Sequence, residues 1–229
     1  MGEAERIKEV YRKRDLNGKS REYTKFNPSA LFIFQQREKA IIQALKSNGM
    51  IYLADKKILD VGCGTGDILR QFINYGAKPE HLHGIDLIPE RIKIAKKLSP
   101  NIDFHYGNAE NLPFKKQYFD IVLQFTMFTS ILNIEMKRKI AEEILASLNQ
   151  NGVILWYDYF ISKPSNPDVH GVKKREIKSL FPDCIFNFKK ITLAPPITRV
   201  LAPYSFLSCY LLEKIPFLCT HFLTVIKKH

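Results

Sequence analysis

The chain has 229 residues, 45% of them hydrophobic, which is enough to bury the core of one α/β domain. Residues 1–25 are highly charged and do not resemble a signal peptide, and no run of about 18 uninterrupted apolar residues predicts a transmembrane segment. The four cysteines form no Cys-x-x-Cys pair and no plausible metal set with the histidines. We therefore expect reduced thiols, a cytoplasmic location and no metal site.

Short apolar stretches that suit strands alternate with amphipathic stretches that suit helices along the chain. The predicted strands lie near residues 57–61, 81–86, 102–106, 119–124, 151–158, 184–193 and 219–227. The predicted helices lie near residues 3–15, 28–48, 65–75, 89–98, 135–149, 172–181 and 203–214. This alternation predicts the α/β class, with a doubly wound and mostly parallel sheet.

The turn after the first predicted strand is the most informative segment. Ile58–Val61 is short and apolar, and glycine then occupies every second position of Gly62–Gly66. Glycines can take positive φ there and let a ligand approach the backbone closely. The next strand ends in Asp86, whose carboxylate can accept two hydrogen bonds from a ribose diol. Because Asp67 stands where a dinucleotide fingerprint needs its third glycine, and would repel a pyrophosphate, the pattern predicts a ligand with adenosine but no phosphate.

Two further strands end at the same predicted crevice. The strand that ends at Tyr106 runs into a polar turn, in which Asn108 could hydrogen-bond the edge of adenine. The strand at 119–123 delivers Gln124 and Phe125 to the same rim.

With these motifs, the region from about Asp55 to Ile161 resembles the class I S-adenosylmethionine-dependent methyltransferases. The pattern Asp60-x-Gly62-x-Gly64-x-Gly66, Asp86 and residues 107–114 lie in the order and spacing of that family. The resemblance implies a Rossmann-like sheet of seven strands with the last antiparallel, S-adenosylmethionine as methyl donor and S-adenosylhomocysteine as product. It implies cofactor contacts from Asp60, Gly62, Cys63, Gly64, Thr65, Gly66, Asp86, Leu87, Asn108, Ala109, Glu110, Gln124 and Phe125. Many members have Asp where this chain has Asn108, and an amide can also pair with adenine.

We expect a single methyltransferase domain with two additions to its core. Residues 1–50 would form an N-terminal helical cap, residues 51–161 the cofactor-binding core, and residues 162–229 the acceptor side. Between the last two strands, Pro195-Pro196 and an apolar helix at 204–214 interrupt the expected hairpin. Its apolar side chains could form a lid, an acceptor wall or a peripheral membrane contact, although extra core is favoured for most of them.

The net charge of +12 is unevenly distributed. Counting Lys and Arg against Asp and Glu gives +4 for residues 1–40, +1 for residues 41–170 and +7 for residues 171–229. The cofactor core is nearly neutral, so the charge bears on the acceptor, for which a small, anionic or carrier-linked molecule fits. Nucleic acid is disfavoured because no basic run is interleaved with aromatic residues, and a plain solvated surface stays an alternative.

Methyl transfer from a sulfonium is an in-line displacement that needs alignment and exclusion of water. A hydroxyl acceptor also needs a base, whereas a carbon acceptor needs only positioning. Asp158 and Tyr159 end the fifth predicted strand at its ligand side, and His170 follows in a Pro/Asn-rich loop, so these three are the candidate base or orienting groups. A helix cap or ion pair for Asp158 and an ordinary loop position for His170 stay open. Tyr23, Arg37 and Tyr204 are candidate substrate or lid residues.

The main hypothesis is an O-methyltransferase that acts on a sugar or a similar small polar metabolite. It is based on the flank-built lid and on Asn166-Pro-Asp168 and Leu193–Pro196, which look like the same region of bacterial methyltransferases of surface-polysaccharide biosynthesis. A carbon methyltransferase on a quinone or lipid precursor is the first alternative, supported by the apolar C-terminal flank. An RNA methyltransferase, supported only by charge, and a cofactor-binding subunit without catalysis are the others.

Overall fold

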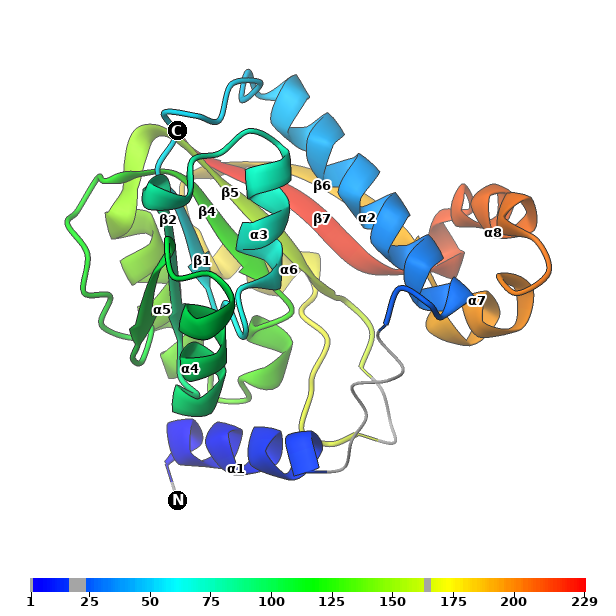
Figure 1. Cartoon of the computed structure of the whole chain (residues 1–229), viewed down its shortest axis with the longest axis horizontal. Helices are drawn as coiled ribbons and strands as arrows, with labels where there is room; N and C mark the ends of the chain where they lie inside the picture. Colours follow the sequence, from blue (N-terminus) through cyan, green and yellow to red (C-terminus); the bar gives the residue numbers. More distant parts are fainter. Residues whose placement is uncertain (1, 17–23, 163–165) are drawn as a thin grey trace.

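The computed structural model describes residues 2–16, 24–162 and 166–229, in which a central sheet carries helices on both faces (Figure 1). The described strands are β1 (Ile58–Val61), β2 (Leu82–Asp86), β3 (Asp103–Tyr106), β4 (Phe119–Phe125), β5 (Leu148–Tyr159), β6 (Cys184–Leu193) and β7 (Cys219–Lys228). They pair in the order β3-β2-β1-β4-β5-β7-β6. Strands β1 to β5 pair in parallel, and β7 lies antiparallel between β5 and β6. The predicted seven-stranded, mostly parallel and doubly wound sheet is confirmed.

The described helices follow the predicted order, with one addition. They are α1 (Glu3–Leu16), α2 (Pro28–Ser47), α3 (Asp67–Asn74), α4 (Pro89–Leu98), α5 (Ile134–Ser147), α6 (Lys174–Leu180), α7 (Pro195–Leu201) and α8 (Phe206–Glu213), with short 3₁₀ turns η2 (Pro79–His81), η3 (Phe128–Ser130) and η4 (Pro216–Leu218). The N-terminal helical cap of the predicted fold is present as α1 and α2. Helix α2 begins where expected because the Asn27 side chain accepts a hydrogen bond from Ser29 N at 3.0 Å.

The added helix is α7, and it corrects the prediction of a single helix at 204–214 between the last two strands. Pro195 and Pro196 were interpreted as a break, but they occupy the first turn of α7. Proline is tolerated there because the first helical N–H groups have no partner within the helix. The predicted helical insertion is therefore confirmed, and it contains α7, α8 and η4 (Figure 1).

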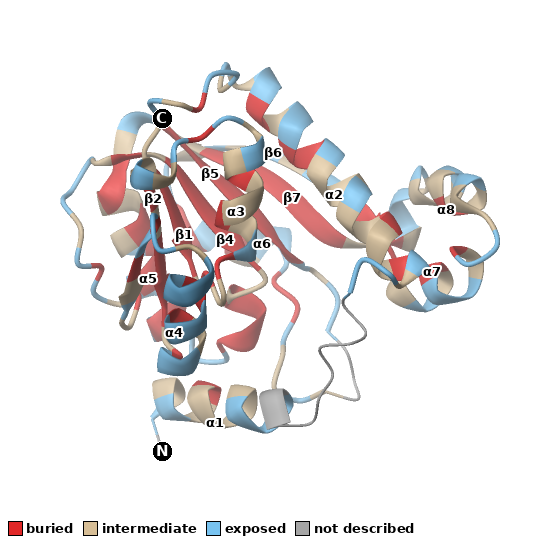
Figure 2. Ribbon diagram, viewed as in Figure 1, coloured by how far each residue is buried: buried red, intermediate tan, exposed pale blue. Residues whose placement is uncertain are grey.

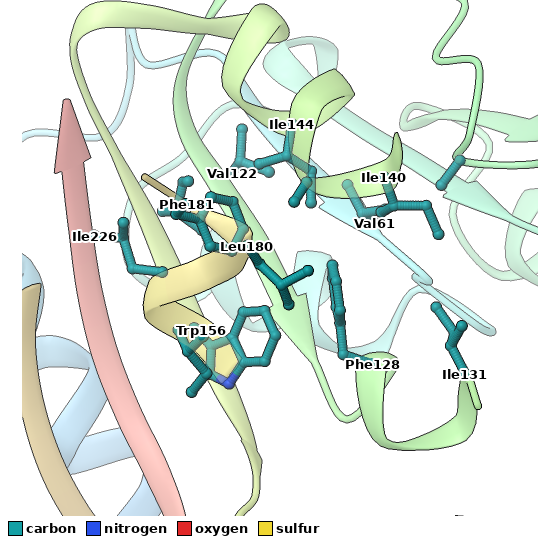
Figure 3. Packing of buried hydrophobic residues seen from close by; sticks show 14 of the residues in the cluster. Val61, Val122, Phe128, Ile131, Ile140, Ile144, Trp156, Leu180, Phe181 and Ile226 are labelled. Carbon is teal, nitrogen blue, oxygen red and sulfur yellow. The ribbon is translucent and has the colours of Figure 1, made fainter. Parts of the chain in front are cut away.

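Alternation along the strands sends successive side chains to opposite faces of the sheet. One face packs on α5 and α6, and Figure 3 shows Trp156 and Phe128 there beside Ile140, Leu180 and Phe181. The other face packs on α2, α3 and α4 through a second buried cluster. The central strands β1, β2, β4, β5 and β7 are therefore buried on both faces, as their red colour in Figure 2 shows, whereas the edge strands β3 and β6 carry exposed residues.

Candidate functional site

The glycine turn after β1 lies at the carboxyl end of the parallel sheet. Gly62 has φ +79°, and a Cβ built on it would lie 2.9 Å from the Met127 side chain. Gly64 has φ +55°, and a Cβ built on it would meet no atom within 4 Å. The turn therefore needs glycine at Gly62 for close packing, and its backbone at Gly64 is open to a ligand.

Asp86 at the end of β2 fixes this turn. Its Oδ2 accepts a hydrogen bond from Gly64 N at 2.8 Å, and its Oδ1 accepts one from Ile88 N at 2.9 Å. Burial raises the pKa of Asp86 above its usual range, and these backbone hydrogen bonds oppose the rise. Asp86 is 9% exposed and lines the adjoining pocket, where the remaining lone pairs of its carboxylate can meet hydroxyl groups.

The pocket next to Gly62 is lined by residues from six helices and strands and from the loops between them. The predicted residues in its lining are Gly62, Asp86, Leu87, Asn108, Ala109 and Phe125. Sequence reasoning missed Ile7, Tyr11, Ile85, Ile88, Arg91, Gly107, Thr126, Met127, Ser130, Ile131, Met136 and Ile140. For Ile7 and Tyr11 of α1, the sequence shows only a helical spacing of apolar residues. This spacing predicts a helix but does not indicate what the helix packs against.

The other predicted cofactor residues lie beside the pocket lining. They are Asp60, Cys63, Gly64, Thr65, Gly66, Glu110 and Gln124. Glu110 holds the Asn108 side chain by two hydrogen bonds, of 2.8 and 3.0 Å. Gln124 is fully buried and donates to Asp158 at 2.9 Å, so its side chain lies in the core. Direct contacts of these seven residues with a cofactor stay a prediction.

Two buried polar atoms near the turn lack partners among the described residues. They are Asp60 Oδ1 and Arg37 Nε. Burial and the nearby charge of Asp86 raise the pKa of Asp60 to about 8, and the charge of Arg37 lowers it in part. Unpartnered buried polar groups are costly, so they indicate a ligand that completes them. The ammonium and carboxylate of an amino-acid group match this pair, which fits the methionine end of S-adenosylmethionine.

The structure does not support Asp158 as a base that touches an acceptor. Its side chain is fully buried on the α5 side of the sheet, because alternation along β5 sends Trp156 and Asp158 to that face. Its carboxylate accepts hydrogen bonds from Thr129 N at 3.1 Å, Thr129 Oγ1 at 2.8 Å, Gln124 Nε2 at 2.9 Å and Tyr159 N at 2.9 Å. Burial raises the pKa of Asp158 to about 6, although these hydrogen bonds act to lower it. These contacts favour a role in holding η3 beneath the pocket.

The remaining candidates are spread over the molecule. Tyr159 is 37% exposed and packs its ring on His221, at 3.7 Å between centroids. His170 is exposed, and its Nδ1 lies 3.3 Å from Ser162 Oγ. Tyr204 is 88% exposed on the α7–α8 insertion. Tyr23 lies outside the described residues. The structure therefore brings Arg37, Tyr159 and the backbone of His170, which donates to Thr129 O at 2.8 Å, close to the site, and it leaves Tyr204 on the projecting insertion.

Aromatic rings pack together on the α2 side of the sheet, where β4 and β5 end and β7 begins. Tyr157 lies 5.6 Å from Phe125 and stacks on His221 at 4.6 Å between centroids. The Arg37 guanidinium lies 5.6 Å from the Tyr157 ring centroid and 6.0 Å from that of Phe125. Burial and the charge of Arg37 lower the pKa of His221 to about 3, so this imidazole is neutral at pH 7.

Part of the chain is similar to a known protein family. Residues 58–152 match the family model described as a methyltransferase domain.

Within the described residues, no group of three or more His, Cys, Asp or Glu side chains could hold a metal ion. The helices that the structure describes include none that is long and apolar enough to cross a membrane.

Two curated relatives are similar over the same part of the chain. The demethylmenaquinone methyltransferase of Chlorobaculum parvum is 34% identical over 141 residues, which is 61% of this chain and 55% of the relative. The ubiquinone/menaquinone biosynthesis C-methyltransferase of Campylobacter jejuni is 29% identical over 109 residues, which is 46% of this chain and 45% of the relative. The matches thus span about half the length of these relatives.

Among solved structures, the S-adenosylmethionine-dependent methyltransferase of Methanosarcina mazei has the same fold. It superposes with a TM-score of 0.56 at 16% identity, over 78% of this chain and 95% of that chain. At this identity the likeness establishes the fold alone.

Proposed function

We propose that this chain, whose residues 58–152 match a methyltransferase domain, uses S-adenosylmethionine to methylate a ring carbon of a quinone precursor. The names of both relatives support this acceptor class. They do not support O-methylation of a sugar, which the sequence favoured. They support instead its first alternative, the carbon methyltransferase on a quinone or lipid precursor.

The pocket supports a specific placement of the cofactor. The ribose would meet the free lone pairs of Asp86, and adenine would lie near Asn108 and Ala109. The methionine ammonium would pair with Asp60 and its carboxylate with Arg37, which would complete the two buried atoms without partners. These assignments run along one edge of the sheet, from the end of β3 to the end of β4.

The aromatic rings where β4 and β5 end and β7 begins are the observation that carries the acceptor class. Phe125, Tyr157, Tyr159 and His221 form a continuous aromatic cluster next to the proposed methionine site. Flat aromatic molecules stack favourably on such rings, whereas a sugar would need several hydrogen-bonding side chains. Tyr159, partly exposed, would contact the acceptor, and buried Tyr157 and His221 would support it from behind.

A carbon acceptor also agrees with the burial of Asp158, the main candidate for a general base. When bound, S-adenosylmethionine supplies a methyl carbon that the electron-rich ring carbon attacks, with the C–S bonding pair passing to sulfur and the displaced ring proton to water. This chain's residues would hold the two reactants in line and exclude water from the contact. The carbon nucleophile needs no deprotonated hydroxyl, which agrees with the burial of Asp158.

The test is methyl transfer to a panel of acceptors by the purified chain. Radiolabelled S-adenosylmethionine would be offered with a demethylmenaquinol of short side chain, a nucleotide sugar and a mixed RNA. We expect label in the hydroquinone and none in the others. Label in the sugar would restore the O-methylation hypothesis, and label in the RNA would restore the nucleic-acid alternative.

A further inference from the structure

The α7–α8 insertion forms a projection beyond the end of the sheet. We call residues 195–218 the apolar tip; it comprises α7, α8 and η4 and lies at the far side of the molecule from α4 and α5 (Figure 1). A small core of its own fixes it to α2. Phe32 of α2 meets Phe206 at 5.6 Å between centroids, and Ser29 and Thr198 hydrogen-bond at 2.7 Å. The tip is therefore held in one orientation relative to the crevice.

Several large apolar side chains of the apolar tip are exposed. The exposed ones are Val200 at 64%, Tyr204 at 88%, Leu207 at 67%, Leu211 at 59% and Phe217 at 77%. Phe26, two residues before α2 begins, is 99% exposed and lies three residues from Ser29, which contacts the tip. Single exposed apolar residues are ordinary, but a group of this size on one projection marks an interaction surface.

The exposed charge of the apolar tip has one sign. Its charged residues are Arg199, Glu213 and Lys214. Arg199 and Lys214 are exposed. Glu213 is partly buried and accepts a hydrogen bond from Thr192 N at 3.0 Å, so it turns toward β6. The tip therefore presents apolar side chains beside two cations, within a segment, residues 171–229, that carries an excess of seven positive charges.

We propose that the apolar tip docks the protein on an anionic lipid bilayer. Tyr, Leu and Phe side chains would enter the boundary between headgroups and acyl chains, and Arg199 and Lys214 would meet lipid phosphates. A second copy is a poorer occupant, because a symmetric contact between identical tips would bring the cations of one tip against those of the other. The proposal is independent of which acceptor the site takes.

Docking through the tip would bring the crevice close to the bilayer surface. Helix α2 contacts the tip through Phe32, and five residues later Arg37 lies against the aromatic cluster. An acceptor with a lipid tail would then reach this cluster while its tail stays in the bilayer. Methylation of a water-soluble acceptor would not depend on docking. Failure of membrane docking can therefore be distinguished from failure of the proposed function.

The test is co-sedimentation of the whole chain with vesicles, without cofactor or acceptor. We expect binding to vesicles of phosphatidylcholine mixed with phosphatidylglycerol, and weaker binding to phosphatidylcholine alone. Leu207→Asp should lower the vesicle affinity at least tenfold, and Lys214→Glu should lower it about fivefold or more in the anionic vesicles. Leu98→Asp is the matched control, because Leu98 is 58% exposed on α4 and should leave binding unchanged.

Three results would overturn the proposal. The first is that the wild-type chain sediments with neither kind of vesicle. The second is that Leu207→Asp and Leu98→Asp lose vesicle affinity equally. The third is that the wild-type chain binds no vesicles but forms a dimer in solution, which Leu207→Asp abolishes. Normal cofactor binding by Leu207→Asp verifies that this variant is folded. Its turnover of a water-soluble acceptor should match that of the wild type.

Discussion

The Tyr11 hydroxyl lies 2.9 Å from the Ser130 hydroxyl, which ties α1 to the turn after β4 at the edge of the pocket. The same turn accepts a hydrogen bond from Arg6 at its Ser130 carbonyl, at 2.7 Å. Arg91 of α4 lies over the Tyr11 ring, 4.4 Å from its centroid. Helix α1 therefore forms one wall of the pocket and is held there by these contacts.

This arrangement predicts that Tyr11 retains the cofactor. Tyr11→Phe loses one hydrogen bond and should weaken S-adenosylmethionine binding about two- to tenfold, and Tyr11→Ala should weaken it further with faster dissociation. Calorimetry gives the affinity and stopped-flow displacement gives the rate. Lys13→Ala, on an exposed part of α1, is the control. An unchanged dissociation rate in Tyr11→Ala would show that α1 does not retain the bound cofactor.

Asp86 should contribute strongly to cofactor affinity. We expect Asp86→Ala to cost about 1.5–3 kcal/mol of binding free energy, as for charge-assisted hydrogen bonds. Because Gly64 N and Ile88 N also lose their acceptor, the free energy of unfolding must be measured beside the binding isotherm. Asp55→Ala removes an exposed acid and should change neither quantity. Equal affinities of Asp86→Ala and the wild type would refute the ribose assignment.

Cofactor binding should release a proton from Asp60. The pKa of Asp60 is about 8 without cofactor, so this carboxyl is mostly protonated at about pH 6.5. The methionine ammonium, which is protonated at that pH, favours the carboxylate and lowers its pKa on binding. Roughly one proton should therefore leave per cofactor, and the affinity should rise as the pH rises toward about 8.

Calorimetry in two buffers of different ionisation enthalpy measures this proton directly. Asp60→Asn cannot titrate and should abolish the release while leaving the fold intact. The same proton release in Asp60→Asn and in the wild type would assign it to another group.

Asp158 and His170 should not act as general bases. Asp158→Asn disturbs four hydrogen bonds, so we expect a loss of about 1–3 kcal/mol in the free energy of unfolding. Turnover of the folded variant should fall far less than the roughly 10²–10⁴-fold expected on loss of a base. His170→Ala changes an exposed side chain and should alter turnover about twofold or less. A base-sized loss with normal cofactor affinity in either variant would favour a hydroxyl acceptor.

The sequence could predict the sheet and the glycine turn because these depend on local patterns. Buried strands such as Ile58–Val61 read as short apolar runs, and the glycine spacing places their ends at a ligand. The helix α7 was missed because Pro195 and Pro196 suit both a break and a first helical turn.

The contents of the site were harder to predict because they depend on contacts between distant segments. Tyr11 and Ser130 are 119 residues apart, and no local pattern relates them. Asp158 was placed at the correct end of β5, but the sequence did not show that it faces α5 and not the crevice. Alternation predicts only that Tyr157 and Asp158 lie on opposite faces, and the structure shows that Tyr157 takes the α2 side.

The measurement that tests the central claim most directly is the position of the transferred methyl group. The chain would be incubated with S-adenosylmethionine labelled with ¹³C in its methyl group and with a short-chain demethylmenaquinol, and the product examined by NMR. We predict a methyl carbon bonded to a ring carbon, with loss of one ring proton. A methyl carbon bonded to oxygen, or no product from a chain that binds the cofactor, would contradict carbon methylation of a quinone precursor.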